Sequence, residues 1–227
     1  LNLPESRKSS LKDFNVAIWS NDELAPVSKD ISQRCEDVGK NLASIGANVS
    51  YTAKPEHDFL KAEINYQLLL QSVMQSGMSD DEFKKIEEIA SNLDRNDLSA
   101  DAILAKGTVL SHRNWIRQNY AREQIKISWS KFFQEWDILI CPQLATTAIE
   151  HDHRKMSERT IMIDNQEQRF FQQIFWPGLA VNAHLPSTVF PTGLASDGMP
   201  IGLQAIGAVY EDKTTIKFAE LYEEEFK

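Results

Sequence analysis

The sequence has no long apolar run, only two cysteines and no cluster of basic residues. No stretch reaches the roughly 18 to 20 consecutive apolar residues that span a bilayer, and the start shows no secretory leader, so we expect no membrane partner. Cys35 and Cys141 are too few and too far apart for a disulfide framework or a zinc site. Together these absences favour a cytoplasmic protein.

Positive charge is also scarce, with 24 Lys and Arg against 33 Asp and Glu and a net charge of −9. Because nucleic-acid phosphates are bound by clustered Lys and Arg, we expect no nucleic-acid partner. The chain of 227 residues, 42% of them apolar, is long enough to bury one substantial core. We therefore expect a single domain over residues 1–227, with a flexible lead-in over residues 1–10.

Two residue pairs have the spacing of catalytic or metal-binding pairs in other proteins, but their surroundings do not favour such a role. Ser9 and Lys12 have the spacing of a serine nucleophile and a lysine base, but they stand in a polar lead-in where nothing would favour a neutral amine. His151 and His153 flank an aspartate, yet no third His or Cys is near, so a surface loop is favoured over a metal site. The residues alone predict no nucleophile, acid–base pair, metal site or cofactor.

Four of the nine glycines fall within FPTGLASDGMPIGLQAIG (190–207). Their spacings of five, four and five residues differ from the G-x-G-x-x-G of a dinucleotide loop, and a second strand follows where such a loop needs a helix. Asp197-Gly198 is a strong tight-turn dipeptide. The stretch therefore predicts a β-hairpin, after which Asp212 caps a final helix.

The chain opens with a predicted strand, helix and second strand. FNVAIWS (14–20) alternates apolar residues with a period of two. Ser28 is a suitable cap for a helix whose apolar residues recur three or four apart until Gly46 ends it. NVSYT (48–52) resumes extended structure. Such a unit usually joins two parallel strands by a right-handed crossover.

Residues 54–128 are predicted to form a helical insertion or cover. After a first helical segment over 59–76, Ser79 and Glu82 form a capping box for a second helix. A long helix is expected over 111–136. The second helix is expected to bury one apolar face, made of Phe83, Ile86, Ala90 and Leu93.

The last third of the chain mixes strands and helices. DILICP (137–142) predicts a short buried strand that ends at a proline. A polar loop is expected through residues 151–159. Residues 170–180 predict a short helix, interrupted or restarted at Pro177.

From Trp129 onward the sequence resembles the amidase signature family. LKDFNVAIWSNDELAPVSKDI (11–31) in turn resembles the middle of that family. The motifs that carry the later likeness are an aromatic helix, Asp137 to Pro142, Leu185-Pro186, Pro191-Thr192-Gly193, Gly198 to Gln204, and Gly207 to Asp212. The resemblance implies an α/β fold with a mixed β-sheet flanked by helices, the C-terminal portion of the amidase signature fold.

The resemblance also bears on catalysis. The family uses a lysine and two serines, one of them the nucleophile that attacks an amide carbonyl, and the serines lie in or near a Gly- and Ser-rich region. This chain has no GGSSGG-like segment. We therefore expect these residues upstream, in the N-terminal half of the same protein, and assign no catalytic residue here. Neither a metal nor an organic cofactor is implied.

In such enzymes the C-terminal half supplies the rest of the sheet and part of the substrate pocket. The residues expected to bind substrate lie in the loop after Pro142 and in the predicted helix that follows: Gln143, Thr146, Phe175 and Trp176. Gln143 stands where threonine is common, and His184 stands where glycine is common. The resemblance therefore does not predict the acyl group.

The resemblance implies an amidase that hydrolyses a small-molecule amide through an acyl-enzyme on the upstream serine, and it predicts an inactive isolated fragment. A half-sheet with exposed edges is expected to self-associate as a homo-oligomer. Two alternatives stay open. One is the subunit portion of a glutamyl-tRNA amidotransferase, against which the acidic balance counts; the other is a non-catalytic binding or scaffold protein on the same half-fold.

Overall fold

The computed structural model describes residues 2–155 and 158–226. Residue 1 of the predicted lead-in and residues 156 and 157 of the predicted polar loop lie outside the described residues. The chain divides into two compact units, Leu1–Glu56 with Trp129–Lys227, and His57–Ser128. Over the described ranges, the helices fall short of the length and apolar character that a bilayer crossing demands.

The first unit is built on a five-stranded mixed sheet in the order β2-β1-β3-β7-β6. Parallel pairing joins β1 to β2 and β3, and antiparallel pairing joins β7 to β3 and β6. This arrangement confirms the predicted fold class. The strands are β1 (Asn15–Ile18), β2 (Asn48–Ser50), β3 (Ile138–Pro142), β6 (Ser187–Leu194) and β7 (Pro200–Ile206).

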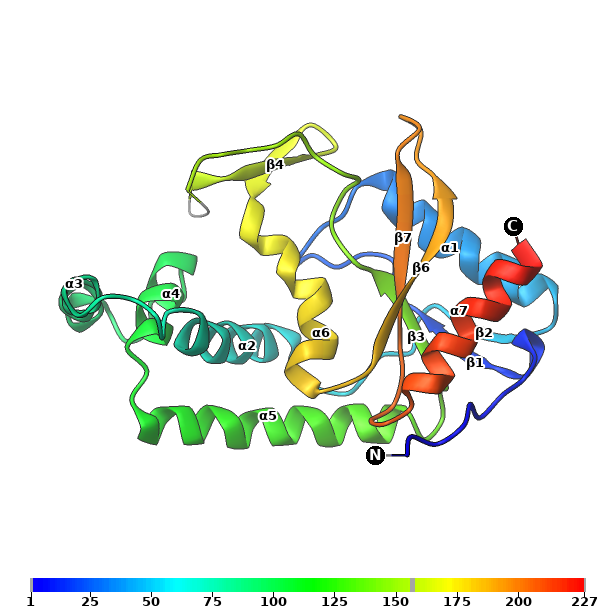
Figure 1. The fold of residues 1–227 in the computed structure, drawn as a ribbon, viewed down its shortest axis with the longest axis horizontal. Helices are drawn as coiled ribbons and strands as arrows, with labels where there is room; N and C mark the ends of the chain where they lie inside the picture. The colour runs from blue at the N-terminus through cyan, green and yellow to red at the C-terminus, as the bar shows by residue number, and fades with distance from the viewer. Residues whose placement is uncertain (1, 156–157, 227) are drawn as a thin grey trace. The chain divides into compact units, whose positions relative to one another are not determined.

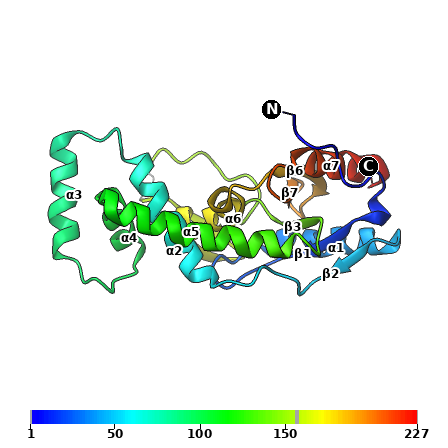
Figure 2. The same ribbon diagram turned by 90° about the horizontal axis from the view of Figure 1, so that it is seen from below.

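Helices cover both faces of this sheet, as Figure 1 shows, with α6 (Phe175–Ala183) on one side and α1 (Lys29–Ser44) and α7 (Asp212–Phe226) on the other. All five residues of β3 are buried, which explains their unbroken apolar run. Both views place α7 beside β6 (Figures 1 and 2), where the ring of Phe218 meets that of Phe190 edge-on at 5.7 Å. The sheet core is therefore covered on both sides by apolar helix faces.

The second unit is helical. It contains α2 (Phe59–Met74), α3 (Asp80–Asn92), α4 (Ala100–Thr108) and the first part of α5 (His112–Phe132). The axes of α2 and α4 come close because Gly107 has no side chain: a Cβ there would lie 2.8 Å from Cβ of Gln71. The first and last residues of the unit are joined, since Nδ1 of His57 lies 3.1 Å from Oγ of Ser128.

The capping box at the start of α3 is confirmed, but the buried face predicted for this helix is wrong. Ser79 and Glu82 exchange the two expected hydrogen bonds. No residue of α3, all of which are described, is buried, and Phe83 is 37% exposed. The spacing of apolar residues shows that a helix has an apolar side, and it does not show that another element covers that side.

Two other boundaries differ from expectation. The long helix α5 ends at Phe132, so Trp136 lies outside it, after a turn over residues 133–135, and its ring stacks on that of Phe132 with centroids 6.4 Å apart. The helix expected over 170–180 consists of a 3-10 helix, η3 (Phe170–Ile174), and then α6, which starts at Phe175 and holds Pro177 in its first turn.

A hairpin that the sequence did not reveal precedes this region. It consists of β4 (Thr160–Ile163) and β5 (Gln166–Arg169), which form a separate two-stranded sheet. Asp164 and Asn165 link them with φ angles of 47° and 68°. Asp and Asn tolerate this left-handed conformation better than most residues, which explains a tight turn without glycine.

The half-buried imidazole of His57 is expected to make the helical unit sensitive to pH. Burial lowers the pKa of His57 to about 4, against about 6.5 in an unfolded chain. Between these values the unfolded state binds more protons, so stability is present at neutral pH and falls as the pH drops from about 6.5 to about 4. We expect a loss of about 1 kcal/mol at pH 5, since partial exposure screens the effect.

Hydrogen exchange of α2 peptides at pH 7 and pH 5 measures this loss. His57→Gln removes the titrating group and is expected to reduce the difference in α2 stability between the two pH values. His112→Gln, at an exposed position, is expected to leave that difference unchanged. An equal pH response in all three proteins would contradict the role of His57.

Candidate functional site

A cavity of about 580 Å³ opens where β3 ends. Pro142 is the last residue of β3, and the following loop leaves the sheet at the carboxyl edge of the parallel strands, a common place for ligand sites in α/β folds. The wall comes from this loop, from α1, from η3 and from the β6–β7 hairpin. It includes Ile31, Gln143 to Leu144, Thr146 to His153, Arg159, Phe170, Gln173, Val189 and Pro200 to Gly202.

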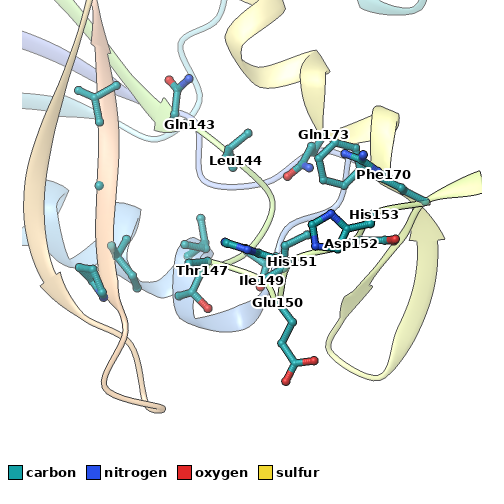
Figure 3. A pocket seen from close by; sticks show the side chains of 18 residues that line it. Gln143, Leu144, Thr147, Ile149, Glu150, His151, Asp152, His153, Phe170 and Gln173 are labelled. Carbon is teal, nitrogen blue, oxygen red and sulfur yellow. The ribbon is translucent and has the colours of Figure 1, made fainter. Parts of the chain in front are cut away.

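Most of the wall that the cavity presents is apolar. Figure 3 shows the side chains following the loop from Gln143 to His153, facing Phe170 and Gln173. Leu144 and Phe170 lie on the inner side of this arrangement, while the carboxylate of Glu150 points away from it. The site can therefore hold an apolar group, with amide and hydroxyl groups at its border.

The four residues expected to bind substrate lie in two different environments. Gln143 and Thr146 line the cavity. Phe175 and Trp176 are buried in the core, and both rings meet Trp19 edge-on, at 5.8 and 5.6 Å. Nε1 of Trp176 donates a hydrogen bond to the carbonyl of Ala25 at 3.0 Å. A substrate contact of these two aromatic side chains stays a prediction.

Other lining residues were not predicted from the sequence. Phe170 and Gln173 belong to η3, which directly precedes Phe175 and Trp176 in the chain. Ile31 is one of the apolar residues that recur three or four apart along α1. Ile201 lies in the Met-Pro-Ile-Gly segment, and the presence of that motif in the resemblance was the one available signal for it.

Gln204 holds the rim of the cavity in place. Its side chain is 1% exposed, and its Nε2 donates to the carbonyls of Pro142 at 2.9 Å and Trp176 at 2.8 Å. Its Oε1 accepts from Oγ of Ser187 at 2.9 Å. One amide thus joins the end of β3, the start of α6 and the start of β6. Because Pro142 directly precedes Gln143, this amide also determines where the lining loop begins.

An ion pair between Asp152 and Arg154 lies at the border of the cavity. Arg154 contacts the carboxylate of Asp152 through Nε and Nη2 at distances of 2.7 to 3.1 Å. These hydrogen bonds lower the pKa of Asp152 to about 2, so it stays ionised at any physiological pH. Nε of Arg159 donates to the carbonyl of Arg154 at 2.8 Å. The arginines therefore organise the loop.

The described residues do not assemble a metal centre or a reactive thiol. No group of three or more His, Cys, Asp and Glu among them is arranged to hold a metal ion. The rings of His151 and His153 meet edge-on with centroids 6.3 Å apart. Burial raises the pKa of the thiols of Cys35 and Cys141, which disfavours the thiolate that a nucleophile requires.

Serines and lysines of the described chain are not paired with each other as nucleophile and base. The hydrogen bonds that lysine side chains make go to carboxylates and carbonyls, such as those of Lys54 with Asp22 and Lys213 with Glu5. The His57–Ser128 pair belongs to the helical unit, and neither residue is part of the cavity wall. The cavity can bind and orient a ligand, and the residues of its wall offer no activated nucleophile.

Comparison with known proteins places this geometry in a family. The Amidase family profile matches residues 2–216. A curated relative, the A subunit of the glutamyl-tRNA(Gln) amidotransferase of Oceanobacillus iheyensis, is 23% identical over 240 residues, which cover 97% of this chain and 46% of the relative. The chain thus spans about half the length of this relative.

Solved structures share the fold. A bacterial aryl acylamidase of the amidase signature family superposes with a TM-score of 0.67 at 15% identity, covering 96% of this chain and 44% of that protein. The A subunit of the glutamyl-tRNA(Gln) amidotransferase of Thermotoga maritima gives a TM-score of 0.66 at 16% identity, covering 99% of this chain and 45% of that subunit.

Replacement of Gln204 tests its role at the cavity rim. Gln204→Leu keeps the volume but leaves two buried carbonyls without their donor, so we expect a loss of about 2 to 4 kcal/mol in the free energy of unfolding. Urea denaturation measures it. The exposed Gln134→Leu is the matched control and should change stability by less than about 0.5 kcal/mol. A loss no larger than that of the control would show that Gln204 does not hold the rim.

Proposed function

The chain belongs to the amidase family, and we propose that its full-length protein hydrolyses the carbon–nitrogen bond of a small-molecule amide, with the cavity at the end of β3 receiving one side of the substrate. The observation that carries the proposal is the position of this cavity. It lies at the carboxyl edge of the parallel strands. Gln143, the first residue of the loop that lines it, follows Pro142, whose carbonyl accepts a hydrogen bond from Gln204.

The reaction needs a nucleophile that the wall of the cavity lacks. We propose that a serine in the N-terminal half of the same protein attacks the amide carbonyl. The carbon–nitrogen bond breaks, the amine leaves with a proton, and the acyl group stays on the serine as an ester. Water then attacks this ester, releases the acid and restores the serine hydroxyl. The proposal requires no cofactor.

The chemistry of the wall favours a neutral and largely apolar substituent. Leu144, Ile149 and Phe170 supply apolar surface, and Gln143 and Thr146 can hydrogen bond to a polar atom. Asp152 is ionised and bound to Arg154 at the border. Because a carboxylate on the substrate would lose its hydration against this largely apolar wall, we propose that neutral amides are preferred over anionic ones.

Activity of two purified proteins tests the proposal. We expect the full-length protein to hydrolyse neutral aryl or aliphatic amides such as acetanilide, and to lose this activity with a serine-hydrolase inhibitor. The 227-residue chain alone is expected to be inactive toward the same amides. Inhibitor-sensitive turnover by the isolated chain would contradict the location of the nucleophile, and an inactive full-length protein over a broad amide panel would contradict the reaction.

A variant that fills the cavity tests its contact with substrate. Leu144→Trp places a larger side chain in the wall, so we expect KM to rise about tenfold for amides with bulky acyl groups and to change little for acetamides. Leu98→Trp, at an exposed position of the helical unit, is the control and should leave KM unchanged. Equal KM values for the two variants would show that the substrate does not enter this cavity.

A second candidate is an amidotransferase component that acts on a charged transfer RNA with a partner chain. The relative from Oceanobacillus iheyensis, matched over nearly the whole chain, favours it. The net charge of −9 suggests that a partner would supply the RNA contact. Co-purification of a partner chain, with amidation of glutamyl-tRNA, would support this candidate, and amide hydrolysis by the full-length protein alone would favour the first.

A further inference from the structure

Three consecutive residues at the start of α1 contact the cavity or its walls. The backbone N–H of Lys29 donates to Oδ2 of Asp164, in the β4–β5 turn, at 2.9 Å. The carboxylate of Asp30 binds Ser196, in the β6–β7 turn. Ile31 lines the cavity itself. One helical turn therefore connects the cavity to the tips of two hairpins.

The contact between Asp30 and the β6–β7 turn consists of two hydrogen bonds to one carboxylate oxygen. Oδ2 of Asp30 accepts from the backbone N–H of Ser196 at 3.0 Å and from its Oγ at 2.7 Å. Both bonds involve an ionised acceptor, and such bonds are about twice as strong as neutral ones. The two residues are 166 positions apart in the chain. The interaction therefore orders a distant loop.

Arg34 reinforces this contact from the next turn of α1. Asp30 and Arg34 are four residues apart and so lie on the same side of the helix. Nη2 of Arg34 donates to the carbonyl of Leu194 at 2.8 Å. A Cβ on Gly193, whose φ is +123°, would lie 3.2 Å from the guanidinium carbon. Glycine at this position therefore permits both the backbone conformation and the close approach of Arg34.

The turn that Asp30 holds is internally rigid. The N–H of Ala195 donates to the carbonyl of Met199 at 2.8 Å, and the N–H of Gly198 donates to the carbonyl of Ala195 at 3.0 Å. Pro200 and Ile201 follow directly and line the cavity. The position of Ser196 therefore constrains Pro200 and Ile201 in the cavity wall through a short, hydrogen-bonded turn.

The β4–β5 hairpin is held by the packing of Ile161 and Ile163, which are buried, and by an anchor at its tip. It is a two-stranded sheet apart from the main sheet, and isolated two-stranded hairpins are only marginally stable. Arg159 just before it and Phe170 just after it line the cavity. The bond from Lys29 to Asp164 fixes the tip of this hairpin to the same helical turn that holds Ser196.

We infer that Asp30 and Asp164 are positioning residues, which set the width of the cavity by fixing two opposite hairpins to the first turn of α1. The inference rests on the proposed function only in taking the cavity as the substrate site. Neither residue is expected to touch the reacting atoms. Their loss is expected to loosen the walls, so that bulky groups are held less well while the chemical step is unchanged.

Hydrogen exchange and steady-state kinetics of the full-length protein test the inference with graded variants. Ser196→Ala removes one of the two bonds to Asp30, and Asp30→Ala removes both. Asp164→Gly keeps a residue that tolerates the left-handed turn while removing the oxygen that accepts from the N–H of Lys29. Asp37→Asn is the matched control, because this residue lies on α1 but binds Gln33 and Lys40.

We expect amide exchange in residues 194–199 to accelerate about tenfold in Asp30→Ala, less in Ser196→Ala, and not in Asp37→Asn. Asp164→Gly should accelerate exchange in residues 160–169 instead. KM for bulky neutral amides should rise about five- to twentyfold in Asp30→Ala, with kcat within twofold and KM for acetamides unchanged.

Unchanged exchange at 194–199 in Asp30→Ala would overturn the inference, and so would equal changes in KM for bulky and small amides. The exchange experiment needs no turnover. Absence of amide hydrolysis in the unmodified full-length protein would therefore count against the proposed reaction, while the exchange pattern would still decide whether Asp30 and Asp164 fix the two walls.

Discussion

The site depends above all on one buried amide, the side chain of Gln204. Three separate elements come to an end or begin around it: β3 at Pro142, α6 near Trp176 and β6 at Ser187. Buried carbonyls without a donor are costly, so the positions of these elements are coupled through the amide. The cavity opens at the same point because the chain must leave the sheet after Pro142.

The cavity has a base formed by the edge of the main sheet, and walls formed by two hairpins whose turns are hydrogen-bonded to α1. The base is the sheet edge, packed against Trp19, Phe175 and Trp176. The walls are two hairpins whose tips reach the first turn of α1. Asp152 in the cavity wall is neutralised by Arg154. A largely apolar space bounded by satisfied polar groups is suited to a neutral ligand.

The sequence predicted the main sheet because its signals are local. The period-two pattern of residues 14–20, the helix cap at Ser28 and the Asp197-Gly198 turn each act over a few residues, and the structure has a strand, a helix and a hairpin at these places. Family motifs then supplied the class of fold. The hairpin β4–β5 has no apolar alternation along both strands and no glycine in its turn, so these residues offered no comparable signal.

The site was only partly predictable, because its remaining contacts join residues far apart in the chain. The family resemblance pointed to the loop after Pro142, and Gln143 and Thr146 of that loop line the cavity. Phe175 and Trp176 are predicted to bind substrate from the same resemblance, but they pack on Trp19, more than 150 positions away, which no local pattern reveals. The bond between Asp30 and Ser196 is equally invisible in the sequence.

The central claim is that the acyl or amine side of an amide occupies the cavity after β3. The most direct measurement is a crystal structure of the full-length protein with a covalently trapped neutral acyl group on its nucleophile. The account predicts that the trapped group lies against Leu144, Phe170 and Ile201. A group that points away from this loop and leaves Gln143 in contact with solvent alone would contradict it.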